Sequence, residues 1–314
     1  MNLDTLDIIV LVTYSILILF VGLFVSRKKT DEVNSSDYFL ASKSLPWWAV
    51  GASLIAANIS AEQFIGMSGS GFAVGLAIAS YEWMAALTLI IVGKYFLPIF
   101  IEKGLYTIPQ FLEKRYNARV KSIIAIFWIA LFVFVNLTAV LFLGATAMDT
   151  IIGNGDGSLI LSSIIVLALF TTAYSVWGGL SSVAWTDVIQ VGILIIGGLI
   201  TTGIALYHVS PDNSLWGGME YIFAKAPEKF DMILEKGHKE YNNLPGIAVL
   251  VGGIWIANIY YWGFNQYIIQ RTFAAKSLKE SQKGIVFAAI LKMIVPLIVI
   301  IPGIIAYVMY TENP

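Results

Sequence analysis

The chain has 314 residues, of which 58% are hydrophobic and 12% are charged, with a formal net charge of −1 and a mean hydropathy of +0.80. Soluble domains contain about 45–50% apolar and about 25% charged residues, so this composition excludes an ordinary soluble protein and indicates an integral membrane protein. The absence of cysteine excludes disulfides and thiolate metal sites, and nothing in the charge indicates nucleic-acid binding.

Runs of about 20 apolar residues predict eight transmembrane spans. We expect them at residues 8–26, 46–68, 74–100, 122–147, 158–177, 184–206, 246–268 and 284–310. Only helices and closed barrels satisfy every backbone polar group in lipid, so the expected fold class is all-α, a polytopic membrane helix bundle. The first span lacks the features of a cleaved signal peptide and is expected to remain as a helix.

The positive charges predict an orientation, because Lys and Arg favour cytoplasmic loops. With the N-terminus outside the cell (inner) membrane, thirteen of the nineteen Lys and Arg residues fall in cytoplasmic loops: Arg27, Lys28, Lys29, Lys43, Lys103, Lys114, Arg115, Arg119, Lys121, Arg271, Lys276, Lys279 and Lys283. Four others, including Lys229, fall in the outer segment 207–245. Lys94 lies near a span end, where its stem can snorkel to water. Lys292 is expected two turns into the last span.

The second span is unusual because it places Asn58, Ser60, Glu62 and Gln63 within six residues. In hydrocarbon an unsatisfied polar group costs several kcal/mol, and a charge at the centre costs roughly 2.5–3.5 kcal/mol or more. These side chains either hydrogen-bond to neighbouring helices or face a polar cavity. The number of polar residues in the spans favours the cavity.

A second stretch repeats the pattern of the first. Residues 45–60 read LPWWAVGASLIAANIS and residues 244–260 read LPGIAVLVGGIWIANIY, and both run into residues that disfavour a continuous lipid-facing helix. By the predicted orientation the first begins at the cytoplasmic face and the second at the outer face. Paired interrupted helices in opposite orientations are typical of transporters with a binding site near the middle of the membrane.

Several strings carry a resemblance to a known family. They are LPWWAVGASLIAANISAEQFIGMSGSG (45–71), YEWM (81–84), VGKYFLPIFIEKG (92–104), WTDVIQV (185–191), YYWGFNQYIIQRT (260–272) and QKGIVFAA (282–289). The chain resembles the sodium/solute symporter family, and within it the sodium/sugar cotransporters, over almost its whole length. The resemblance implies a five-plus-five inverted-repeat transporter fold with broken helices, and sodium-driven uptake of a sugar.

The resemblance also implies a division of the chain. Residues 1–45 would form an extra N-terminal helix and a cytoplasmic loop, and 46–206 the first five-helix repeat. Residues 207–245 would form an extracellular segment, and 246–314 the first two helices of the second repeat. The chain is therefore expected to be an N-terminal fragment, truncated after the second helix of that repeat and unable to complete a transport cycle alone.

The implied sugar site combines residues from both repeats. Gln63, Glu82, Asn258 and Lys292 would bind hydroxyls, Tyr261 would stack on the pyranose ring beside Trp262, and Met67 and Tyr81 would form an outer hydrophobic cover. Sugar hydroxyls both donate and accept, which suits this mixture of carboxylate, ammonium and amides, and the apolar sugar face suits an aromatic wall. The alternatives are a Glu–Lys pair that serves only packing, and aromatic residues that lie at the membrane interface.

For sodium, the resemblance implies the backbone carbonyls of Ala56 and Ile59 at the break of the second span, together with hydroxyls from a later helix. Sodium is a hard cation that prefers oxygen ligands, so an unwound backbone is suitable. Asp187 would lie on the ion exit route, or it caps the helix 184–206. Ala85 replaces a serine of the family that touches sugar, which leaves the identity of the sugar open.

The leading functional hypothesis is sodium-driven symport of a hexose such as galactose or glucose, with sodium, sugar and the lipid bilayer as partners. The alternatives are symport of another polyol, such as an inositol, and a membrane sensor or scaffold derived from a transporter. The two histidines, His208 and His238, both lie in the outer segment, and there is no nucleophile–base or metal-ligand cluster. An enzyme is therefore not expected.

Overall fold

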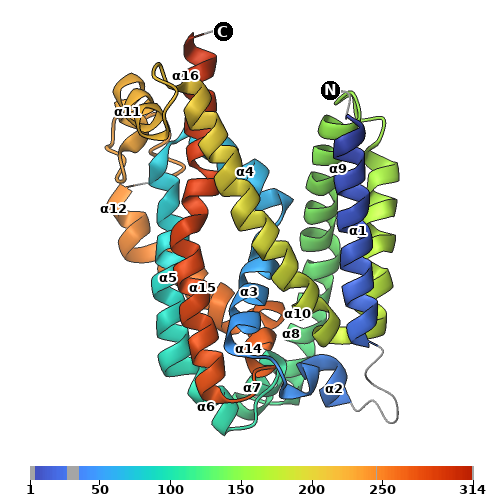
Figure 1. Ribbon diagram of the computed structural model, residues 1–314. Coiled ribbons are helices and arrows are strands. Elements are labelled where there is room, and N and C mark those ends of the chain that lie inside the picture. Colours follow the sequence, from blue (N-terminus) through green and yellow to red (C-terminus); the bar gives the residue numbers. More distant parts are fainter. Residues whose placement is uncertain (1–3, 27–34, 245, 313–314) are drawn as a thin grey trace.

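The computed structural model describes residues 4–26, 35–244 and 246–312. In these ranges the chain forms helices joined by turns, and its only extended pairing is an isolated bridge between Leu45 and Ala275. Figure 1 shows the helices packed side by side, with both termini at the same end of the molecule. The all-α bundle predicted from composition is confirmed. The loop charges Arg27, Lys28 and Lys29 lie outside the described residues.

The first half of the chain begins with α1 (Thr5–Ser26) and the short α2 (Ser35–Leu40). The spans that follow are α3 (Trp47–Asn58) with α4 (Ala61–Ala73), α5 (Ser80–Ile91) with α6 (Leu97–Glu102), α8 (Ala118–Leu131) with α9 (Thr138–Ile152), and α10 (Ile160–Val209). One-turn π-helices, Val92–Phe96 and Phe132–Leu137, continue two of them, and α7 (Ile108–Arg115) lies between α6 and α8.

The remainder begins with α11 (Leu215–Lys225) in the outer segment. The next span comprises α12 (Gly246–Ala248), a π-helix (Val249–Gly253), α13 (Ile254–Ile259), a second π-helix (Tyr260–Phe264) and α14 (Gln266–Phe273). The last comprises α15 (Leu278–Val299) and α16 (Ile301–Glu312). Within the described residues, six helical segments are long and apolar enough to cross a membrane unaided. Helices α3 and α4 are each too short to cross a membrane alone, and only the two together have the length of a span.

The first broken helix comes apart at two residues. Ile59 and Ser60 adopt extended backbone, with φ/ψ of −85°/112° and −123°/−179°, between the end of α3 and the start of α4. The second broken helix is interrupted at Asn265, which is extended at −82°/117°. Figure 1 shows that α3 starts at the end of the bundle that holds α2, whereas α12 starts at the opposite end. The two broken helices therefore run in opposite directions, but the matching Ala-Asn-Ile strings mark the break only in the first.

The fifth and sixth predicted spans are not separated by a loop. A single residue, Gly179, with φ +55° and ψ −154°, reverses the chain inside α10. A Cβ there would lie 2.6 Å from the carbonyl oxygen of Tyr38, so both the dihedral and the space require glycine. The Tyr38 hydroxyl donates to the carbonyl of Val176 at 3.1 Å and so satisfies a group exposed by the reversal.

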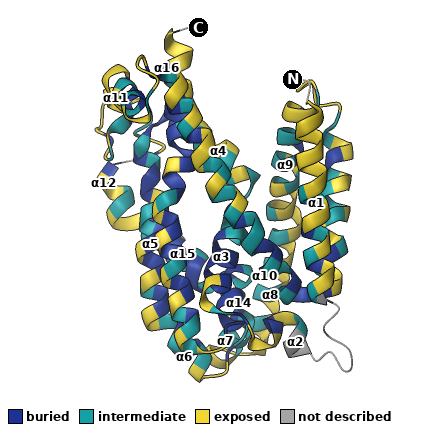
Figure 2. Ribbon diagram, in the orientation of Figure 1, coloured by how far each residue is buried: buried dark blue, intermediate teal, exposed yellow. Residues whose placement is uncertain are grey.

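The core lies between α3, α5, α10 and α15, whose facing residues are buried, whereas α1, α8 and α9 expose much of their surface (Figure 2). Helices α3 and α15 approach closely through Gly51 and Gly284. A Cβ at Gly51 would lie 2.5 Å from the carbonyl oxygen of Gly284, and a Cβ at Gly284 would lie 2.8 Å from that of Trp47. Small residues permit this backbone contact, as is common between membrane helices.

Candidate functional site

One cavity of about 550 Å³ lies between the two broken helices, α5 and α15. It is lined by all eight side chains for which the resemblance implied contact with sugar: Gln63, Met67, Tyr81, Glu82, Asn258, Tyr261, Trp262 and Lys292. Asn58, Glu62 and Tyr260 also line it. The structure thus brings together residues from four separate spans, and Ala85 faces the same space.

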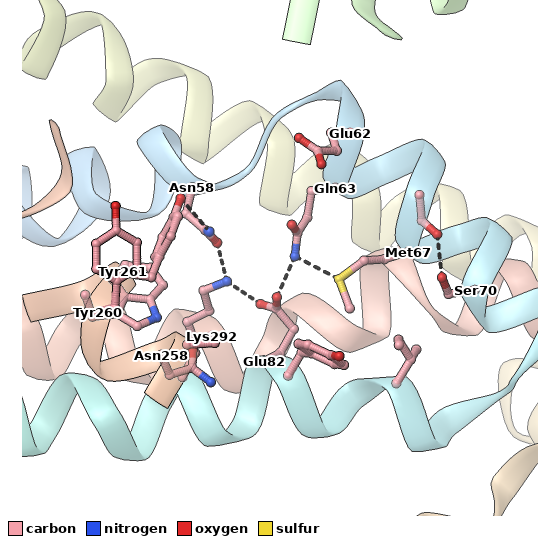
Figure 3. A pocket seen from close by; sticks show the side chains of 16 residues that line it. Asn58, Glu62, Gln63, Met67, Ser70, Glu82, Asn258, Tyr260, Tyr261 and Lys292 are labelled. Carbon is pink, nitrogen blue, oxygen red and sulfur yellow. Dashed lines mark hydrogen bonds and ion pairs between the residues drawn. The ribbon is translucent and has the colours of Figure 1, made fainter. Parts of the chain in front are cut away.

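A chain of polar contacts crosses this cavity (Figure 3). The Lys292 ammonium of α15 donates to the Asn58 side-chain oxygen of α3 and forms an ion pair with Glu82 of α5. Gln63 of α4 donates from Nε2 to Glu82 Oε1 at 2.5 Å and to the sulfur of Met67 at 2.8 Å. Asn58, Gln63, Met67 and Glu82 come from α3, α4 and α5, whereas Lys292 comes from α15, so the contacts join segments that lie far apart in the sequence.

The Lys292–Glu82 pair is buried, with side-chain exposures of 1% and 5%. Lys292 lies 14 positions after the start of α15 at Leu278, about 21 Å along the helix. Helix α15 thus starts six residues before the predicted span 284–310, and Lys292 lies about four turns into the helix. A charge this far from either end of the apolar segment Leu278–Glu312 needs partners, and Glu82 and Asn58 are those partners.

An aromatic wall closes one side of the cavity. The Tyr261 hydroxyl accepts from Asn58 Nδ2 at 3.1 Å and lies 2.8 Å from the Tyr267 hydroxyl. The Trp262 ring packs edge-on to Tyr261 at 5.1 Å, and the Lys292 ammonium lies 5.3 Å from the centre of the Trp262 ring. Trp262 is only 2% exposed, so its ring packs inside the bundle and not on the outer surface of the helices.

Ser60 is a correction to the sequence analysis, because it does not share the cavity of Asn58, Glu62 and Gln63. It lines a second cavity of about 540 Å³, between the first break, α1 and α10. Ala56 and Ile59 line this second cavity too. The two extended residues of the break, Ile59 and Ser60, thus face the second cavity, whereas Asn58 before the break and Gln63 after it line the first.

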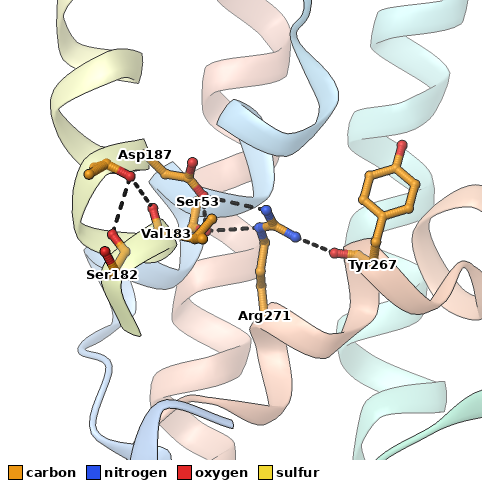
Figure 4. A network of polar contacts seen from close by, with 7 residues as sticks. Ser53, Ser182, Val183, Asp187, Tyr267 and Arg271 are labelled. Carbon is orange, nitrogen blue, oxygen red and sulfur yellow. Dashed lines mark hydrogen bonds and ion pairs between the residues drawn. The ribbon is translucent and has the colours of Figure 1, made fainter. Parts of the chain in front are cut away.

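A second buried network lies between α3, α10 and α14 (Figure 4). Ser53 Oγ donates to Asp187 Oδ2 at 2.5 Å and accepts from Arg271 Nε at 2.9 Å. Arg271 Nη2 lies 3.5 Å from Asp187 Oδ2, and Nη1 donates to the carbonyl of Tyr267. The arginine therefore has an acidic partner, a hydroxyl and a carbonyl within the core.

Two sequence interpretations fail at this network. Arg271 was expected in a cytoplasmic loop, but it is 9% exposed inside the bundle. Asp187 does not cap a helix, because α10 continues unbroken from the reversal at Gly179 through Asp187. Nothing local in the sequence predicts the pairing, since the partners lie 84 residues apart; the only available signal was an acidic residue inside an apolar run.

The comparisons with known proteins agree with this geometry. Residues 38–314 match the sodium:solute symporter family. The chain is 61% identical over its whole length to a sodium/glucose cotransporter of Vibrio parahaemolyticus, of which it covers 57%. It is 31% identical over 98% of its length to sodium/glucose cotransporter 1 of Sus scrofa, of which it covers 48%. The chain thus spans about half the length of these relatives.

A solved structure has the same fold. It is a Na⁺-coupled sialic acid symporter in a substrate-bound, outward-open state, which matches 99% of this chain and 62% of its own with a TM-score of 0.83. Its sequence identity is 24%, so the likeness concerns the fold alone. The transporter fold with broken helices is confirmed, whereas the division into domains and the roles of individual residues stay predictions.

Proposed function

The chain belongs to the sodium:solute symporter family, and we propose that its activity, in the protein of which it is part, is sodium-driven symport of a hexose such as galactose or glucose. The observation that carries this proposal is the chain of contacts from Asn58 through Lys292 and Glu82 to Gln63, in a cavity between two oppositely directed broken helices. The proposal is also supported by the similarity to two relatives, from Vibrio parahaemolyticus and Sus scrofa, that are named sodium/glucose cotransporters.

The chemistry of the cavity suits a sugar. A hydroxyl that enters between Lys292 and Glu82 accepts from the ammonium and donates to the carboxylate, and the amides of Gln63 and Asn258 offer both functions. Tyr261 and Trp262 provide a flat apolar surface for the C–H face of the ring, with Met67 and Tyr81 at the outer side. Because Gln63, Glu82 and Lys292 are paired with one another, sugar replaces existing hydrogen bonds and no bare charge is exposed.

We place sodium at the first break. Helix α3 ends at Asn58, so the carbonyls of its last turn, including that of Ala56, are not all used within the helix. With the carbonyl of Ile59 they offer oxygen ligands beside the second cavity. Asp187 of α10, which accepts from Ser53 about one turn before Ala56 on α3, would receive the ion on its way to the cytoplasm when the contacts with Ser53 and Arg271 open.

The proposed location is the cell inner membrane, with the N-terminus outside. The support is the distribution of lysine and arginine. Lys103, Lys114 and Arg115 lie on or beside α6 and α7, at the same end of the bundle as α2, whereas α11 and the outer segment lie at the other end with both termini (Figure 1).

Sugar uptake into proteoliposomes tests the function. With the whole protein reconstituted, labelled galactose should accumulate under an inward sodium gradient and fail to do so when choline replaces sodium. Lys292→Gln should abolish this uptake, whereas Lys94→Gln, which removes a lysine that lies in a span but outside the cavity, should preserve it. Displacement of galactose by inositol but not by glucose would instead favour a polyol, and binding without uptake under any gradient would favour a sensor.

A further inference from the structure

A groove on the outer surface of the bundle is not part of either site described above. It has a volume of about 590 Å³ and lies where the first half of α15 meets the start of α3. It is lined by Trp47, Lys279, Gln282, Lys283, Val286, Phe287 and Ile290. The ring of Trp47 packs edge-on against Phe287 at 5.4 Å and forms its apolar wall. Charged residues thus occupy one end of the groove and apolar residues the other.

The lining residues form one stripe along α15. Lys279, Lys283, Val286 and Ile290 follow at spacings of four, three and four, which places them on one face of the helix. All four are exposed. The eleven positions from Lys279 to Ile290 correspond to about 16 Å of helix, close to half of the roughly 30 Å hydrocarbon core. A groove of this length fits one acyl chain within one leaflet.

The charge at the end of the groove is positive. Glu280, the neighbouring acid, accepts from the backbone N–H of Trp47 at 3.1 Å and from Lys283 at 3.2 Å, so its carboxylate already has partners. Among the ion pairs of the described residues none involves Lys279. The groove therefore offers a net positive end with one uncommitted ammonium.

We propose that this groove is a binding site for an anionic phospholipid such as phosphatidylglycerol. The phosphate lies between Lys279 and Lys283, and one acyl chain follows Val286 and Ile290 against Trp47 and Phe287. Basic residues at a membrane surface attract anionic lipid by about 1 kcal/mol each, and the apolar floor adds contact with the chain. Because the apolar wall joins Trp47 of α3 to Phe287 of α15, bound lipid holds these two helices together.

Quenching of Trp47 fluorescence by brominated lipid tests the proposal. The protein, in mixed detergent micelles, is titrated with phosphatidylglycerol or phosphatidylcholine that carries bromine on the acyl chain. The chain has nine tryptophans, so the signal of Trp47 is taken as the difference between the wild type and Trp47→Phe. We expect this component to be quenched saturably by phosphatidylglycerol at concentrations at which phosphatidylcholine has little effect.

Substitutions of lysine identify the headgroup contact. At about 1 kcal/mol per lysine, Lys279→Gln should weaken the apparent affinity about fivefold, and Lys279→Gln with Lys283→Gln about 25-fold. Lys276→Gln is the matched control, since it removes the same charge from an exposed residue just before α15 that does not line the groove.

Three results would overturn the proposal. Equal quenching by the two lipids would mean ordinary boundary lipid. An effect of Lys276→Gln as large as that of the double variant would mean general surface charge. No Trp47 component in the quenching by either lipid would mean that protein, either another segment or a second copy, covers the groove.

Discussion

Lys292 and Glu82 lie 210 positions apart in the sequence and form a buried ion pair, in which each side chain neutralises the charge of the other. Removing one partner of a buried pair leaves an uncompensated charge, at a cost of about 3–5 kcal/mol. We expect Glu82→Gln and Lys292→Gln each to lower the free energy of unfolding in detergent by about this amount. The double variant should lose less than the two single losses combined. Additive losses in denaturant titrations would contradict the pairing.

The hydroxyl of Tyr261 should matter more than that of its neighbour Tyr260. Tyr261 Oη bonds to Asn58 and Tyr267, whereas among the described residues the buried Tyr260 hydroxyl has no hydrogen-bond partner. Tyr261→Phe should therefore cost about 1–3 kcal/mol of stability, because it leaves buried partners unsatisfied, and Tyr260→Phe should be nearly neutral.

For sugar uptake, Tyr261→Ala should lose much more than Tyr261→Phe if ring stacking dominates. Equal losses in uptake would show that the phenol oxygen is the important group.

Sodium and sugar should bind cooperatively through the first broken helix. Ala56 lies before the break, Ile59 lies in it and Gln63 lies about one turn beyond it, so ordering the backbone for the ion also positions the amide for sugar. Couplings of this kind are typically about 5–150-fold and are reciprocal. In the whole protein, replacing sodium by choline should weaken equilibrium sugar binding by such a factor, measured by calorimetry. Identical sugar affinity in the two salts would rule out this mechanism.

The crossing of α3 and α15 should not tolerate a methyl group. Gly51→Ala directs a Cβ at the backbone oxygen of Gly284, which cannot move aside as a side chain can; we expect a loss of about 1–3 kcal/mol. Gly69→Ala is the control, because it is a helical glycine of α4 with nothing within 4 Å of its built Cβ. That change should be neutral or stabilising by up to about 1 kcal/mol. Thermal unfolding of both variants under the same conditions decides between them.

The outer segment should respond to acid through Asp212. The side-chain hydrogen bonds from Ser210 and Ser214 lower the pKa of this carboxyl below its ordinary 3.8. A folded-state pKa below the unfolded value stabilises the turn at pH above 3.8, and this contribution is lost as the pH falls through the lowered pKa. Asp212→Asn should therefore speed amide exchange around residues 210–218 at pH 6, and this difference should shrink as the pH falls through the lowered pKa. A pH-independent difference would contradict the assignment.

Much of this fold follows from local signals that add up along the chain. Apolar runs predict the spans because each helix must cover its backbone in lipid, and the polar residues around Asn58 predict a cavity because lipid cannot solvate them. The placement of Lys292, Glu82 and Gln63 on one cavity followed from the resemblance, together with the high energy of each residue in lipid. These inferences required no knowledge of which helix touches which.

The features that the sequence analysis missed depend on contacts between distant segments. Arg271 reads as a loop charge until α3 and α10 supply Ser53 and Asp187. Ser60 reads as a residue of the same cavity as Asn58 until the fold places it in a second cavity against α1 and α10. Gly179 is one glycine among 27, and only the packing of Tyr38 against it distinguishes a chain reversal from an ordinary helical glycine.

The reversal at Gly179 has a consequence for biosynthesis. The two halves of α10 are joined without a polar linker, and Tyr38 of α2 packs directly on the joining residue. Because no loop separates the two halves of α10, neither half can be inserted and oriented separately. We therefore expect them to enter the bilayer together as one helical hairpin. A tag, a protease site or a glycosylation acceptor inserted next to Gly179 would have to push α2 aside, which makes this end of the hairpin the wrong place to report on topology.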